Sequence, residues 1–267
     1  ESSAASDVYK RQSQALSLVL AETERLEKFE DANIVASEVY QSRLQHGQSL
    51  LDRVQRLMGG QSWKAEDITA LVLGIGPGSY TGLRIAATFA KLWATSLNLP
   101  IYTVSSLALM LGSREGEGLV LPLMDARRLS AYLGLFNYQG GIYQRLQEDK
   151  HVDWQSWLDQ ESALFKDLDH LTLLADKPDS FVDVLKKTYP HYRLDIISGE
   201  EALPQIERAF APSLWTLWKR VEDPHILTPN YAHATLAEQT WAKENQRSVA
   251  GAQENEAYIH RYKTSLD

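Results

Sequence analysis

The sequence contains no cysteine among its 267 residues, which excludes disulfide bonds and catalysis by a thiolate. No apolar run approaches the length that spans a bilayer, and no hydrophobic segment typical of a signal peptide is visible. We therefore expect a cytoplasmic protein that does not associate with membranes. The net charge of −8 argues against a chain that grips a nucleic-acid backbone by itself.

Motifs for catalysis and cofactor binding are also scarce. The seven histidines are scattered, and no two have the H-x-x-x-H or H-E-x-x-H spacing of a metal-binding helix. The G-x-S-x-G turn of serine hydrolases is absent. The P-loop pattern fails because Gly76 and Gly82 are too far apart, and the glycines from residue 74 to 78 run G-x-G-x-G, which does not match the dinucleotide fingerprint. We expect no catalytic residue, no metal site and no cofactor held by this chain.

The most informative stretch runs from residue 68 to 97 and centres on a glycine-rich turn, Gly74–Arg84. Ahead of the turn, residues 71–73 form the short apolar run of a buried strand. Behind it, apolar residues recur at spacings of three and four, which predicts a helix. Ser79 or Thr81 can accept hydrogen bonds from the unpaired amides at the start of that helix. The sequence therefore predicts a strand, a tight turn and a helix.

This glycine turn has two interpretations. A helix N-terminus attracts anions through its unpaired amides, so the turn could form a weak anion-binding site. The alternative is a tight connection from strand to helix with no ligand. The residues of the candidate anion site are Gly76, Gly78, Ser79, Thr81, Gly82 and Arg84.

Two helices are expected to flank the turn. The helix that follows it is apolar on nearly all sides and carries one narrow polar line, Arg84, Thr88, Lys91 and Thr95. Such a helix is buried on more than one side, either within its own domain or against a second protein. Residues 48–58 form an amphipathic helix that ends at a pair of glycines.

The residues of the turn and the strands around it resemble the TsaB (YeaZ) family. The resemblance rests on the decapeptide from Gly76 to Ile85, on Val104-Ser105-Ser106-Leu107, on Asp125-Ala126-Arg127-Arg128 and on Pro229-Asn230-Tyr231. It implies an α/β protein of the actin-like ATPase (ribonuclease-H-like) fold, with two related lobes whose mixed sheets are flanked by helices. The family is a subunit of the bacterial machinery that makes threonylcarbamoyladenosine (t6A) in tRNA.

The resemblance implies a non-catalytic scaffold that binds and activates a homologous catalytic subunit, TsaD, through a bundle of two helices from each protein. A TsaE-type ATPase then joins, the ATP is bound mainly by the partners, tRNA binds only through the complex, and the chain alone forms a homodimer. The expected interface residues are Leu50, Val54, Leu57, Leu83, Ala87, Lys91 and Ala94.

Two other functions stay open. One is a nucleotide-binding, actin-like phosphotransferase, which the glycine turn alone favours and which titration with ATP and magnesium would reveal. The other is a glycoprotease-like peptidase, which the lack of metal-ligand spacing and of a nucleophile–base pair disfavours. Cleavage of casein or a glycopeptide that survives extensive purification would favour the peptidase.

Four regions are expected along the chain. Residues 1–12 have no strand or helix periodicity, and we expect them to be a non-native segment in the place of the family's first strand and its Asp-Thr loop. Residues 13–112 would form the N-terminal lobe and residues 113–231 the C-terminal lobe. Residues 232–267 would form a terminal helix and a polar tail.

Within the C-terminal lobe, strands and helices are expected to alternate up to residue 197, and a further helix to span 202–220. Trp154 and Trp157 lie three residues apart, which indicates the buried face of a helix rather than a base-stacking platform. Asp125 follows an apolar strand, where it either carries a function or anchors an Asp–Arg turn.

Overall fold

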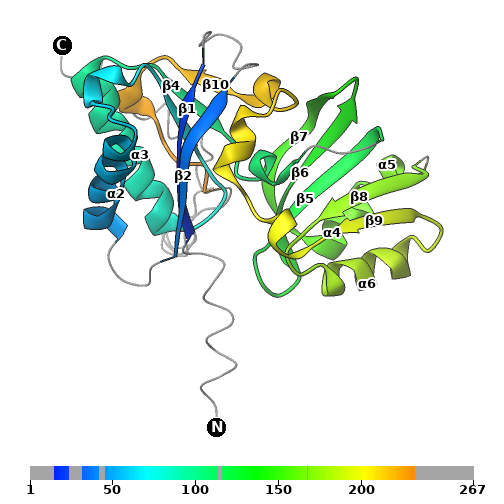
Figure 1. The fold of residues 1–267 in the computed structure, drawn as a ribbon. Coiled ribbons are helices and arrows are strands. Elements are labelled where there is room, and N and C mark those ends of the chain that lie inside the picture. Colours follow the sequence, from blue (N-terminus) through cyan, green and yellow to red (C-terminus); the bar gives the residue numbers. More distant parts are fainter. Residues whose placement is uncertain (1–14, 24–31, 42–45, 113–115, 167, 232–267) are drawn as a thin grey trace, which may run out of the picture.

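The computed structural model describes residues 15–23, 32–41, 46–112, 116–166 and 168–231. They form two lobes side by side, each built on β-sheet with helices packed against it (Figure 1). No helix in these ranges is long and apolar enough to cross a membrane. The expected non-native segment 1–12 and the expected terminal helix and tail, 232–267, lie outside the described residues.

The first lobe holds two small sheets and two long helices. An antiparallel pair consists of β1 (Ala15–Glu22) and β2 (Asn33–Gln41). The second sheet has the order β10-β4-β3, in which β3 (Leu71–Gly74) runs parallel to β4 (Ile101–Val104) and β10 (Lys219–Val221) runs antiparallel to β4. The helices are α2 (His46–Gly60) and α3 (Tyr80–Leu97).

The second lobe is built on one five-stranded sheet of order β7-β6-β5-β8-β9. Its strands are β5 (Gly118–Asp125), β6 (Ser130–Gln139), β7 (Ile142–Asp153), β8 (His170–Leu174) and β9 (Arg193–Ile197). Three helices follow the chain on this lobe, α4 (Trp154–Gln160), α5 (Ser162–Lys166) and α6 (Asp179–Thr188). β5 and β8 are parallel, whereas β5, β6 and β7 are antiparallel neighbours, so the sheet is mixed.

Both faces of this sheet are covered by apolar side chains. On one face, Trp154 and Trp157 of α4 are fully buried and stack at 5.3 Å between ring centroids, which confirms their expected place in a helix core. On the other face, residues 107–111 and the segment 202–217 pack against β5 and β6. The lobe is therefore a three-layer structure whose central strands are buried on both sides.

The expected helix over residues 202–220 is wrong. The chain forms short 3₁₀ turns there, η3 (Gly199–Ala202), η4 (Ile206–Phe210) and η5 (Trp215–Leu217), and then the strand β10. Pro204 and Pro212 lie within the segment, and proline cannot continue a helix because it lacks an amide hydrogen and clashes with the preceding turn. Since β10 pairs with β4, the chain returns to the first lobe before residue 231.

Three more 3₁₀ turns occur in the described chain. They are η1 (Ala65–Asp67), η2 (Ala108–Met110) and η6 (Pro224–Ile226). After Val104 the chain forms only the single turn η2, and the hydroxyl of Ser105 accepts hydrogen bonds from the amides of Leu107 and Ala108 at its start.

Candidate functional site

The glycine turn joins β3 to α3 and is held in place by the chain near residue 230. Ser79 is the N-cap of α3, and its Oγ accepts a hydrogen bond of 3.3 Å from the amide of Gly82. The amide of Asn230 donates to the carbonyl of Ile75 at 2.8 Å. The strand-turn-helix prediction is thus confirmed, and the C-terminal part of the described chain closes over it.

Gly76 is the one glycine of the turn that tolerates no side chain. Its φ is +111°, in the region that favours glycine. A Cβ built on Gly76 would lie 2.3 Å from the carbonyl oxygen of Asn230 and 2.9 Å from Cδ1 of Leu83. Next to this contact, the rings of Tyr80 and Tyr231 pack at 4.7 Å between centroids. The space that Gly76 leaves is therefore filled by backbone of this chain.

Several polar groups of the turn have partners within the chain. The carbonyl of Ser79 accepts from the amide of Leu83, and the Ser79 hydroxyl already holds the amide of Gly82. The guanidinium of Arg84 donates to the phenol of Tyr80 at 3.2 Å. These contacts give the turn a structural role in joining the strand and the helix, and its role as an anion site stays a prediction.

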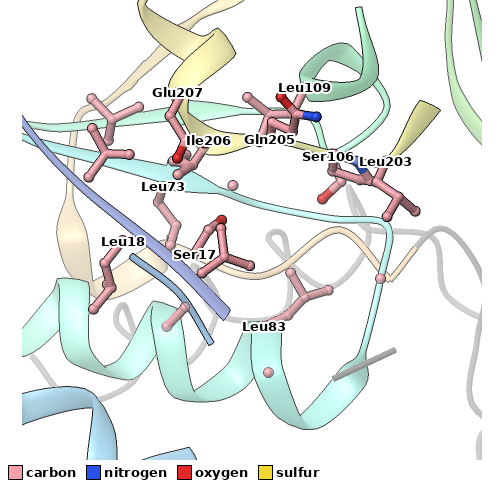
Figure 2. Close-up of a pocket in the computed structure, with 18 of the residues that line it drawn as sticks. Ser17, Leu18, Leu73, Leu83, Ser106, Leu109, Leu203, Gln205, Ile206 and Glu207 are labelled. Atoms are coloured by element: carbon pink, nitrogen blue, oxygen red, sulfur yellow. The ribbon is translucent and has the colours of Figure 1, made fainter. Parts of the chain in front are cut away.

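A large cavity of about 1610 Å³ lies beside the turn and extends toward the second lobe. In the first lobe it is lined by apolar residues of β1, β3, α2 and α3. Figure 2 labels three of them, Leu18 of β1, Leu73 of β3 and Leu83 of α3. Toward the second lobe its lining becomes polar, with the side chains Ser106, Asp125, Arg127, Tyr132, Asp176, Lys177 and Glu200. The three carboxylates outnumber the two cations, so this polar end is not suited to a polyphosphate without a bound cation.

The carboxylate of Asp125 forms a hydrogen bond within its own turn. Its Oδ1 accepts a hydrogen bond of 2.7 Å from the amide of Arg127, at the end of β5. The next residues carry positive φ, +75° at Arg127, +53° at Arg128 and +57° at Leu129. Of the two expectations for Asp125, the structure therefore shows the Asp–Arg turn. The carboxylate of Asp125 accepts its hydrogen bond from a backbone amide.

No group of three or more His, Asp or Glu side chains suited to holding a metal ion occurs within the described ranges. The carboxylates at the polar end of the cavity therefore do not form a metal-binding cluster with one another.

A polar contact between the lobes was not foreseen from the sequence. Ser105, which follows β4 in the first lobe, donates from its hydroxyl to the carboxylate of Asp149 on β7 in the second lobe. Arg145 pairs with the same carboxylate, and its guanidinium lies 4.7 Å from the centroid of the Phe136 ring. Burial raises the pKa of Asp149, and the charge of Arg145 and the hydrogen bond from Ser105 oppose that rise. Nothing in the local pattern of β7 distinguishes Asp149 from its exposed neighbour Glu148.

The residues expected at a partner interface divide into two groups. Leu50, Val54, Ala87 and Ala94 are buried among residues of this chain, so for these four the expectation is corrected. The reason is that α2 and α3 pack against each other and against the strands, and this packing covers their small and branched side chains.

The remaining expected interface residues, Leu57, Leu83 and Lys91, are partly exposed. Lys91 donates from its ammonium group to the carbonyl of His225 at 3.1 Å, so its charge already has a partner within the chain. Two leucines that these helices present to solvent are not among the residues expected at the interface. Leu92 on α3 is 63% exposed and Leu51 on α2 is 43% exposed.

Similarity to known proteins identifies the family of this chain. A family model described as "TsaD: tRNA N6-adenosine threonylcarbamoyltransferase" matches residues 33–182, more than half of the chain. A Bacillus subtilis protein named tRNA threonylcarbamoyladenosine biosynthesis protein TsaB is 29% identical over 215 residues, which is 80% of this chain and 90% of that protein. This chain belongs to the family of that model and, within it, to the TsaB (YeaZ) proteins.

Other members of the TsaB (YeaZ) family agree with this assignment. The Escherichia coli protein of the same name is 36% identical over 91 residues, 33% of this chain and 39% of that protein. A solved Pseudomonas aeruginosa structure, described as similar to the peptidase YeaZ, has 22% identity and a TM-score of 0.61, and covers 82% of this chain and 95% of that one. The predicted α/β, actin-like ATPase (ribonuclease-H-like) fold is confirmed.

Proposed function

We propose that this chain acts in t6A synthesis as a non-catalytic scaffold that binds and activates a TsaD-type catalytic subunit. The names of the TsaB relatives support the pathway, and the match to the TsaD family model supports a partner that is homologous to this chain. Homologous proteins associate readily through equivalent surfaces, in the manner of a two-fold dimer.

The observation that carries the proposal is the exposed face of α2 and α3. These two helices lie side by side on the outside of the first lobe (Figure 1). Each exposes one large aliphatic side chain, Leu51 on α2 or Leu92 on α3, and α3 also exposes the polar residues Arg84 and Thr88. Exposed apolar side chains together with polar ones are typical of a protein–protein interface. In the absence of the partner, the same face would support a homodimer.

The test is light scattering coupled to size-exclusion chromatography, with the chain alone and mixed with its cognate TsaD-type protein. The proposal expects a homodimer that dissociates and forms a one-to-one heterodimer. Leu92→Asp and Leu51→Asp should each raise the dissociation constant at least about tenfold, because a buried charge would replace an apolar contact.

The matched control is Leu146→Asp. Leu146 lies on β7 in the other lobe and is 50% exposed, so this substitution adds the same charge away from the proposed interface. It should leave the dissociation constant unchanged. The proposal would be refuted if the wild-type chain did not bind the TsaD-type protein. It would also be refuted if the helix variants bound with the wild-type dissociation constant.

The same proposal assigns ATP and tRNA to the partners. The polar end of the cavity has an excess of carboxylates, and the net charge of −8 opposes contact with phosphates. A TsaE-type ATPase would then bind only to the complex and not to this chain alone. Isothermal titration of the isolated chain with ATP and magnesium should show no saturable binding below the millimolar range, whereas a micromolar site would favour the phosphotransferase alternative.

A further inference from the structure

The outer edge of β9 is open in the sheet of the second lobe. β9 lies at one end of the sheet, opposite β7 (Figure 1). It pairs in parallel with β8 along its whole length without a register shift. Within the described ranges no strand pairs with its other edge. Because the amides and carbonyls along an open edge lack partners in the sheet, such an edge favours pairing with another strand.

The opposite end of the sheet differs, because β7 is irregular and partly covered. The register of β7 against β6 shifts at two places. The segment 213–216 lies against its outer edge, where the amide of Tyr143 donates to the carbonyl of Ser213 at 2.9 Å and the hydroxyl of Thr216 donates to the carbonyl of Tyr143 at 3.0 Å. Bulges and covering segments prevent pairing at a sheet edge. β9 is therefore the end of this sheet that is suited to accept a further strand.

The backbone of β9 fixes which residues face outward. The amide of Arg193 donates to the carbonyl of Asp169 at 3.2 Å, and the carbonyl of Ile197 accepts from the amide of Ala175 at 3.1 Å. Alternate residues of a strand direct their backbone groups to opposite edges. The outward-facing groups therefore belong to the even-numbered residues, Tyr192, Leu194 and Ile196.

The side chains of β9 are charged on one face and apolar on the other. Arg193 and Asp195 are exposed and lie two residues apart, so they share a face. Oδ2 of Asp195 lies 2.7 Å from Nε2 of His170 on β8, and the Asp195 side chain remains 49% exposed. On the other face, Leu194 packs against the core that includes α4 and α6, whereas Ile196 is 41% exposed.

This pattern is self-complementary in one antiparallel register. A two-fold axis perpendicular to the sheet would place β9 of two copies side by side in opposite directions. With Leu194 opposite Leu194 of the second copy, each Arg193 lies opposite an Asp195, and each Tyr192 lies opposite an Ile196. The outward backbone groups then form the hydrogen-bonded pairs. The two Arg–Asp pairs occupy non-hydrogen-bonded sites, where Cα atoms are about 4.5 Å apart and side chains approach most closely.

The neighbouring registers do not have this property. A register centred on Arg193 places that arginine opposite itself, and one centred on Asp195 places two carboxylates opposite each other. Like charges that face each other across two strands are destabilising. The charges of β9 therefore favour one alignment of two identical edges.

We propose that the outer edge of β9 binds the same edge of a second copy of this chain, in the antiparallel register centred on Leu194, and joins the two five-stranded sheets into one. The complementary charges and the apolar pairing of Ile196 select an identical chain as the occupant. Because α2 and α3 belong to the other lobe, this contact leaves their outer face free. Two one-to-one complexes with a TsaD-type protein could then associate, although the β9 contact does not depend on that partner.

The test is sedimentation velocity on the full chain with Leu92→Asp, which removes association through α2 and α3. A short strand edge forms a small, transient interface, so concentrations from about 10 to 500 µM are used. In this background, Arg193→Asp and Asp195→Arg each place like charges opposite each other and should raise the dimer dissociation constant at least about tenfold.

An equimolar mixture of the two charge variants provides the decisive comparison. Every facing pair in a mixed dimer again has opposite charges, so the dissociation constant should return to within about threefold of the background value. The control Arg220→Asp reverses an exposed charge on β10 in the first lobe and should dimerise like the background. Dimers that are insensitive to the β9 variants, or a mixture that does not recover, would overturn the proposal.

Cysteine cross-linking covers a dimer too weak for sedimentation. The chain has no cysteine of its own, so Arg193→Cys and Asp195→Cys introduce single thiols. Under oxidation the two variants, distinguished by a tag, should cross-link with each other at least about fivefold more than either does with itself. The same residue in two copies would lie about 8 Å apart in this register, which is beyond the reach of a disulfide. Equal cross-linking in all three samples, or none in the mixture, would overturn the proposal.

Discussion

Substitution of Gly76 gives the sharpest test of the contact between the glycine turn and the chain near residue 230. The change Gly76→Ala adds one methyl group at a residue with φ of +111°, where an L-residue is strained by about 1 to 3 kcal/mol. The same methyl group would lie 2.3 Å from the backbone oxygen of Asn230, so the backbone must move as well. Overpacking of this kind costs about 1 to 3 kcal/mol. Together the two effects predict a loss of about 2 to 6 kcal/mol in the free energy of unfolding.

The assay is urea denaturation followed by circular dichroism, with the thermal midpoint as a second measure. For a chain of this size the predicted loss corresponds to a fall of roughly 10 °C in the melting temperature. Gly78→Ala is the matched control, because no atom lies within 4 Å of a Cβ built there and its φ is not positive. The control should change stability by less than about 0.5 kcal/mol. Equal losses in the two variants would refute the assignment of the Asn230 carbonyl to the space beside Gly76.

Two further predictions concern the second lobe. Because burial raises the pKa of Asp149 above its ordinary value of 3.8, the native state binds more protons than the unfolded state just above that pH, and stability should fall as the pH rises through this window. Asp149→Asn should reduce this dependence of stability on pH in urea titrations between pH 4 and 7. The control Glu148→Gln changes an exposed carboxylate and should leave the dependence nearly unchanged. Equal slopes in the two variants would contradict the burial of Asp149. Leu158→Ala should cost about 2 to 5 kcal/mol, since Leu158 is fully buried, whereas Leu146→Ala should stay within about 0.5 kcal/mol. Similar losses for the two leucines would refute the core assignment.

Much of the fold could be predicted because the decisive interactions are local. The apolar run at residues 71–73, the glycines after it and the spacing of apolar residues in α3 each specify their own element without reference to the rest of the chain. The same holds for the capping role of Ser79, which depends on an amide three residues away.

The errors arise where distant segments decide the outcome. The segment 202–220 has enough apolar residues for a helix, but its prolines and its contacts with β5 and β6 turn it into 3₁₀ turns and an edge strand. Likewise, the apolar periodicity of α2 and α3 could not show which apolar side chains face the chain's own core. The structure buries Val54 and Ala87 and exposes Leu92, because the positions of β1, β3 and the loop at residue 225 determine which side of each helix is covered.

The sequence by itself determined the family and the strand-turn-helix unit at Gly76. These follow from residue types at fixed short spacings, which act through backbone sterics and local hydrogen bonds. Only the tertiary structure decided that the Asn230 carbonyl fills the space beside Gly76 and that Asp149 joins the lobes through Ser105. These two features depend on residues more than forty positions apart, and their contact is fixed by the packing of whole layers and not by any local pattern.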